Sequence, residues 1–220
     1  MAHDHQQDHF PEDETVTARI TLPGPESLSP EQRAVFDAVV RGPRGVVVGP
    51  LRAAIHSPEL ADRWQQLGEF LRYRTSLPAR LNELAILVTA RRWNSELEWS
   101  VHVEAARKAG LKEEAIEAIR QGRPPRFADD DESEIYAFAR ELQLHGQVSE
   151  ETYRAVSKRW RERGVVELTA VIGYYTMVSM TLNAHRIPLP DGMPPTLSSA
   201  GDDVPSTLSA LAPLASEGRT

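Results

Sequence analysis

The stretch ARLNELAILVTARRWNSELEWSVHVEAARKAGL, residues 79–111, contains two successive helical patterns, and these decide the fold. Apolar residues in its first half recur at the spacing of one helix face, at Leu81, Leu84, Ala85 and Val88. Its second half predicts a helix over residues 96–109 that ends at Gly110. Polar residues also follow a helical spacing here, so the same stretch is the first place to look for a functional site.

Helix signals continue on both sides of this stretch. Ser29 and Pro30 predict the start of a helix, with Gln32 completing a capping box and Gly42 ending the helix. Further helices are expected over residues 57–74, 112–121, 131–145 and 149–164. The run that begins at Val165 is apolar nearly all round, which predicts a buried central helix.

Only one short run resembles a strand, GVVVG at residues 45–49, and an isolated strand cannot satisfy its backbone hydrogen bonds. The sequence therefore predicts an all-α bundle of about eight helices. We expect three parts: an acidic, His-rich flexible arm at residues 1–28, a helical domain at 29–190, and a disordered tail rich in Pro, Ser and Ala at 191–220.

Composition narrows the classes of partner. The formal net charge is −7 over 220 residues, which argues against nucleic acid. No run approaches the ~18 consecutive apolar residues of a membrane helix, and the acidic start is unlike a signal peptide, so we expect a cytoplasmic protein without a membrane partner. The chain has no cysteine, which excludes disulfides, thiolate nucleophiles and cysteine-ligated zinc. Arginines are concentrated between residues 72 and 92. They could attract a small carboxylate substrate, or they could form a solvated face with scattered ion pairs.

Three polar residues of the opening stretch share one helix face. Ser95, Glu98 and His102 stand at i, i+3 and i+7, with Trp99 beside them. In one interpretation Ser95 and Glu98 form a capping box and His102 is an ordinary half-buried histidine. In the other, Glu98 orients His102, His102 moves a proton near neutral pH, and Trp99 excludes water. Spacing alone favours the first interpretation and permits the second.

The stretch at residues 79–111 resembles the carboxymuconolactone decarboxylase family, within the alkylhydroperoxidase D-like superfamily. The resemblance extends on both sides of it, over roughly residues 43–190. Redox members of that superfamily carry a glutamate, a Cys-x-x-Cys pair and a histidine at the positions of Glu83, Ser95, Glu98 and His102. Without the thiol pair, peroxide reduction is not expected. The resemblance implies an alkylhydroperoxidase D-like helical bundle, a homo-oligomer (trimer or hexamer) and no metal or organic cofactor.

The decarboxylase branch implies the chemistry. It predicts a lyase or isomerase of aromatic catabolism that acts by acid–base chemistry on a small carboxylated lactone or oxo-acid. His102 would donate the proton, Glu98 would orient it, and Ser95 at the helix start or an arginine would stabilise the developing oxyanion. The alternative is a non-catalytic oligomeric binding protein that retains the fold after loss of the redox cysteines.

Four further residues are candidates for this site. Glu83 could reach it from the preceding helix, or serve in a structural ion pair. Arg80 could be the partner of Glu83 or a clamp for the substrate carboxylate. His56 could line the mouth of the pocket, although helix capping is favoured. Of the tyrosines Tyr174 and Tyr175, one is expected in the core and one in the pocket wall, and we assign Tyr175 to substrate binding.

Overall fold

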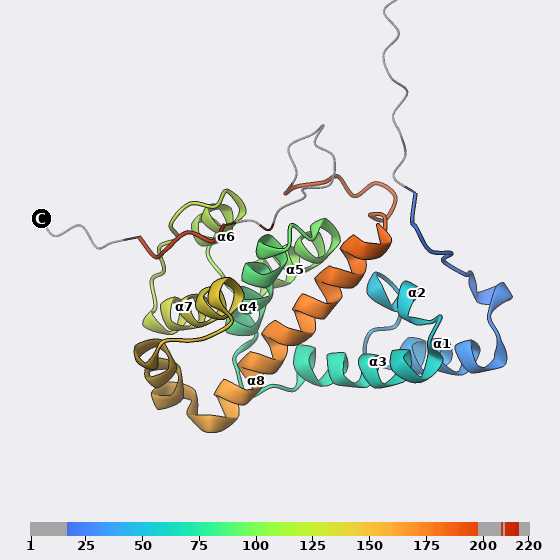
Figure 1. Ribbon diagram of the computed structural model, residues 1–220, viewed down its shortest axis with the longest axis horizontal. Coiled ribbons are helices and arrows are strands. Elements are labelled where there is room, and N and C mark those ends of the chain that lie inside the picture. Colours follow the sequence, from blue (N-terminus) through green and yellow to red (C-terminus); the bar gives the residue numbers. More distant parts are fainter. Residues whose placement is uncertain (1–16, 198–207, 209, 216–220) are drawn as a thin grey trace, which may run out of the picture.

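A computed structural model describes residues 17–197, 208 and 210–215 of the protein, and these form an all-helical fold (Figure 1). This part of the chain contains eight α-helices, one short 3-10 helix and no strand, so the predicted fold class is confirmed. The elements are η1 (Pro25–Ser27), α1 (Pro30–Arg41), α2 (Pro50–Ala54), α3 (Pro58–Tyr73), α4 (Ala79–Arg92), α5 (Glu96–Lys108), α6 (Glu113–Arg120), α7 (Asp130–His145) and α8 (Glu150–His185). The strand-like run at residues 45–49 is a loop that leads into α2.

The predicted capping box at the start of α1 is formed. The Ser29 hydroxyl accepts a hydrogen bond from the backbone N–H of Gln32, and the Gln32 side chain accepts one from the backbone N–H of Ser29 at 3.0 Å. Gly42 follows the last residue of α1 and donates its backbone N–H to the carbonyl groups of Ala38 and Val39. These reciprocal bonds satisfy groups that a helix end leaves free.

The centre of the fold is α4, which packs against α5, α6, α7 and α8. Every residue of α4 from Leu81 to Ala90 is buried, including three polar ones. Two of these bond to backbone: Asn82 donates to the carbonyl of Leu71 at 2.9 Å, and Thr89 donates to that of Ala85 at 2.9 Å. The third is Glu83, a charged group in the core that needs a partner there.

Helix α8 runs diagonally between the group α4–α7 and the group α1–α3, and it contacts helices of both (Figure 1). An 18-residue window within it has a mean hydropathy of 1.4, long and apolar enough to cross a membrane by length and composition alone. Of that window, 56% is buried inside the fold, as in the core helix of a folded domain. The predicted central helix is therefore largely buried, but not on every side, because Val166 is 68% exposed and Met180 is 50% exposed.

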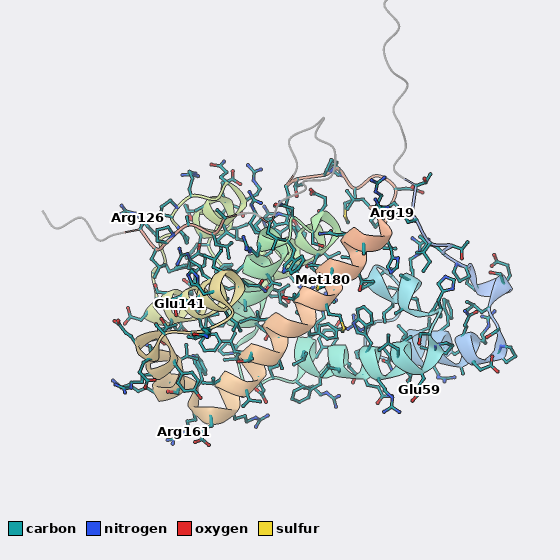
Figure 2. The ribbon with its side chains drawn as sticks, viewed as in Figure 1. Arg19, Glu59, Arg126, Glu141, Arg161 and Met180 are labelled. Atoms are coloured by element: carbon teal, nitrogen blue, oxygen red, sulfur yellow. The ribbon has the colours of Figure 1, made fainter. Side chains whose placement is uncertain are left out.

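The break in α8 lies at Arg161, three residues before the predicted end at Gly164 (Figure 2). Arg161 has φ 56° and ψ −176°, a conformation outside the helical region, and the chain changes direction there. The part of α8 that follows this corner brings Tyr175 against His102 of α5 and Tyr174 against Trp64 of α3. The corner therefore sets where two aromatic residues meet the predicted site.

Residues on both sides of the expected domain, before residue 29 and after residue 190, also pack against the helical domain. Ile20 and Leu22 pack against the core, and the backbone N–H of Arg19 donates to the carbonyl of His185 at 2.8 Å. On the other side, Leu211 is buried, and Tyr136 donates its hydroxyl to the carbonyl of Ala212 at 2.7 Å. The boundaries at residues 28 and 190 stay a prediction. Much of the expected arm and tail, residues 1–16, 198–207, 209 and 216–220, lies outside the described residues.

Replacement of Arg161 by glycine should stabilise the protein. The region of φ and ψ that Arg161 occupies is open to glycine and costs other residues about 1–3 kcal/mol. We expect Arg161→Gly to raise the free energy of unfolding by about 1 kcal/mol, measured by urea denaturation. The matched control is Glu162→Gly at the next, helical position, which should lower that free energy by about 1 kcal/mol. A destabilisation by both variants would contradict the strained corner.

Candidate active site

His102 lies between two carboxylates in the core. Its Nδ1 is 2.6 Å from Oε2 of Glu83, which reaches it from α4. Its Nε2 is 2.8 Å from Oε1 of Glu98, one turn earlier on α5, a close contact that is not well directed as a hydrogen bond. All three side chains are buried, and we call them the histidine–carboxylate trio. Because α4 packs against α5, Glu83 reaches His102 from the preceding helix, as the sequence suggested.

The trio keeps His102 protonated. Burial alone lowers the pKa of His102, but the charges of Glu98 and Glu83 and their contacts outweigh burial and raise the pKa to about 9. A buried charge is costly unless it is paired, and here one imidazolium faces two carboxylates. The trio therefore carries a net negative charge at neutral pH, with a proton held at its centre.

The predicted capping box at the start of α5 is not formed. Ser95 occupies the position before the helix, but its side chain makes no capping hydrogen bond. Its hydroxyl is buried and has no hydrogen-bond partner among the described residues. Glu98, the other half of the expected box, contacts His102 instead. The structure thus gives no support to the interpretation of Ser95 and Glu98 as a simple helix cap.

A cavity of about 360 Å³ opens beside the trio, and we call it the His102 cavity. Glu98 and His102 form part of its wall, whereas Glu83 lies behind His102 and does not line it. Tyr175 packs against His102 with the two rings nearly perpendicular and their centroids 4.9 Å apart. Tyr174 lines the cavity as well, although only one tyrosine of the pair was expected there. Apolar side chains complete the wall: Val47, Leu51, Leu97, Val101 and Val178.

Three arginines line the same cavity: Arg44, Arg52 and Arg72. Each is half-buried, and none forms an ion pair with any residue that the structure describes. Their positive charges exceed the net charge of the trio, so the cavity attracts anions. Arg72 belongs to the arginine cluster of the sequence, but Arg44 and Arg52 lie in a segment whose pattern gave no sign of a site.

Other predicted residues lie elsewhere. Arg80 does not pair with Glu83 or line the His102 cavity, because it binds Asp131 and Glu132 at the start of α7. His56 is exposed, and its Nε2 lies 2.7 Å from the carbonyl oxygen of Thr21. Its contact joins the N-terminal segment to the turn between α2 and α3.

Trp99 and Ser95 are also absent from the wall of the His102 cavity. Trp99 is buried on another side of α5, where it lines a separate hollow of about 510 Å³ beside α6. Spacing along a helix placed Trp99 near the expected stripe, but the two hollows lie on different sides of that helix. Within the described residues, no group of three or more His, Asp or Glu side chains is arranged to hold a metal ion, so we assign no metal ligands.

Residues 58–141 match the model of the carboxymuconolactone decarboxylase family. This segment contains the whole trio and runs from α3 through most of α7. No curated protein matches the chain.

Solved structures share the fold. An uncharacterized peroxidase-related protein from Silicibacter sp. TM1040 aligns with a TM-score of 0.63 and 15% identity, over 79% of this chain and 92% of its own. A second such protein, from Ralstonia eutropha JMP134 and described as an alkylhydroperoxidase AhpD core, gives a TM-score of 0.64 and 13% identity over 79% and 93%. The debrominase Bmp8, solved with 2,3,4-tribromopyrrole, gives 0.61 and 14% over 82% and 94%.

These structural alignments show a common fold, but sequence identities this low do not show a common reaction. The family match is consistent with the fold, and the matched segment contains Glu83, Glu98 and His102. The chain has an AhpD-like helical fold and no cysteine, and over residues 58–141 it is similar to the carboxymuconolactone decarboxylase family.

Proposed function

We propose that the protein is a cofactor-free lyase or isomerase that moves protons in the His102 cavity on a small carboxylated lactone or oxo-acid. The observation that carries this proposal is a buried imidazolium held between two carboxylates at the wall of an arginine-lined cavity. Thiol-dependent peroxide reduction is excluded from the proposal because the chain has no cysteine. We also propose that the protein is cytoplasmic and assembles into a trimer or hexamer.

The contacts of His102 support a particular division of the proton-transfer roles. Both ring nitrogens face carboxylates, so neither is free to touch a substrate. Glu98 lines the cavity and contacts His102, and it is therefore the group that meets the substrate. His102 supplies the proton to Glu98, while Glu83 stabilises the positive charge on His102 from the side away from the cavity. This reverses the roles expected from the sequence, where His102 was the donor and Glu98 only oriented it.

For a carboxylated unsaturated lactone, the steps balance without a co-reactant. The bond between the carboxylate and the ring carbon breaks, carbon dioxide leaves, and the electron pair passes through the conjugated system to the lactone carbonyl oxygen. A cavity arginine stabilises this enolate oxygen. Glu98, protonated through His102, then delivers a proton to carbon, and a solvent proton restores the trio. Isomerisation uses the same groups, with Glu98 first removing a proton from carbon.

Removal of either proton-transfer group should abolish most turnover. We expect Glu98→Gln and His102→Gln each to slow the release of carbon dioxide from 4-carboxymuconolactone by about 10²- to 10⁴-fold. Glu104→Gln is the matched control, because Glu104 lies exposed on the same helix and pairs with Arg107 outside the cavity. Equal rates in wild type and Glu98→Gln would refute the assigned roles. A wild type that binds carboxylates but turns over neither this lactone nor related oxo-acids would favour the binding protein.

The charge on His102 should also appear in the pH dependence of stability. Its pKa in the folded state, about 9, lies above the ordinary value of 6.5, so the protonated form stabilises the fold. This contribution is complete below pH 6.5 and is lost as the pH rises through 9. We expect the difference in free energy of unfolding between wild type and His102→Gln to shrink over that range, as measured by urea denaturation at a series of pH values. A difference that is independent of pH would show that His102 is neutral.

A further inference from the structure

Arg44 is a cation of the His102 cavity without a counter-ion among the described residues. It lies in the loop between α1 and α2, and its Nη2 donates to the hydroxyl of Tyr174 at 3.5 Å. Its Nε is buried and has no hydrogen-bond partner in the part of the chain that the structure describes. A buried guanidinium N–H without an acceptor is costly, and an anion in the cavity would satisfy it.

Tyr174 adds a second donor at the same place. Because its oxygen accepts from Arg44, the hydroxyl hydrogen remains available to a ligand. Burial raises the pKa of Tyr174 to about 12, although the charge of Arg44 opposes this, so the hydroxyl keeps its proton at neutral pH. The ring is held from two sides, by Trp64 at a centroid distance of 6.3 Å and by Tyr175 at 5.2 Å.

Gly68 on α3 leaves the space that these two groups need. A Cβ atom at this position would overlap both the hydroxyl of Tyr174 and Nη2 of Arg44. Glycine inside a helix is less favourable than alanine, and Gly68 lies buried in the middle of α3. The close approach of the hydroxyl and the guanidinium accounts for glycine here.

Charge and shape indicate which anion fits. A guanidinium edge beside a hydroxyl matches the planar oxygens of a carboxylate. The cavity also holds Glu98, which disfavours a dianion such as phosphate, and its remaining wall is largely apolar. A planar carboxylate on a small apolar or aromatic body therefore fits better than a phosphate ester.

We propose that Arg44 and Tyr174, with Gly68 making room for them, form a carboxylate-binding subsite of the His102 cavity that selects small organic carboxylates. The subsite depends on the proposed function in one respect only, namely that its ligand is the substrate on which the trio acts. Arg44 fixes the charge and Tyr174 fixes the orientation of the carboxylate, while the apolar wall receives the rest of the molecule. This assigns to Arg44 the clamp that the sequence suggested for Arg80.

Titration calorimetry with benzoate, an unreactive aromatic carboxylate, tests the subsite without any turnover. Wild type should bind benzoate, and should bind neutral benzamide and inorganic phosphate more weakly. Arg44→Gln should weaken benzoate binding about 10- to 100-fold, the loss of a charge-assisted pair of hydrogen bonds. Tyr174→Phe should weaken it about 2- to 10-fold. Gly68→Ala, which keeps both donors but displaces them, should also lose affinity.

Three further variants separate this proposal from its rivals. Arg63→Gln is the matched control, because Arg63 is exposed on α3 and pairs with Glu59. It should bind benzoate as the wild type does. Arg52→Gln removes a cavity charge that does not contact Tyr174, and its loss should be smaller than that of Arg44→Gln. Glu98→Gln should stop turnover yet bind benzoate at least as tightly, so failure of the proposed function and failure of the subsite remain distinguishable.

Several results would overturn the subsite. These are no saturable binding of benzoate by wild type, equal binding of benzoate and benzamide, or equal losses in Arg44→Gln and Arg52→Gln. Melting temperatures measured without ligand identify a variant that fails to fold. In that case Arg44→Lys, which keeps the charge but not the planar fork, replaces Arg44→Gln, and wild-type affinity in Arg44→Lys would overturn the subsite as well.

Discussion

The buried contact of one imidazole with two carboxylates constrains the rest of the structure. Ionised groups in a core are stable only when paired, and leaving one of them unpaired costs about 3–5 kcal/mol. Helix α4 must therefore present Glu83 to α5, and α5 must turn both Glu98 and His102 inward. The apolar residues around them fix the distance between the two helices. Packing and charge pairing are thus satisfied together at the interface of α4 and α5.

Local sequence signals predicted the helices well. Ser29 with Gln32, the glycines after α1, α5, α6 and α7 and the apolar period of residues 81–88 each depend on neighbours within a few positions, and these helices are where the signals placed them. The corner at Arg161 was missed because no glycine or proline marks it. It depends on how the two parts of α8 pack against different helices, which is information that a local pattern does not contain.

The site was predictable to the extent that it lies along one helix and its neighbour. Glu83, Glu98 and His102 meet as the helical spacing and the family resemblance suggested. Arg80 was misplaced because acidic residues at the start of α7, about fifty positions away, compete for it. Arg44 and Tyr174 are 130 positions apart, and their contact follows from the position of the loop between α1 and α2 beside α8 rather than from any motif.

The family segment, residues 58–141, contains all of the trio, whereas Arg44, Arg52, Tyr174 and Tyr175 lie outside it. The contacts of the trio and part of the lining of the His102 cavity therefore come from separate parts of the chain, which meet only in three dimensions. A substitution at Arg44 or Arg52 would alter the lining of this cavity without removing any contact within the trio. A sequence match confined to residues 58–141 therefore covers the trio but leaves out two of the three cavity arginines and both tyrosines of its wall.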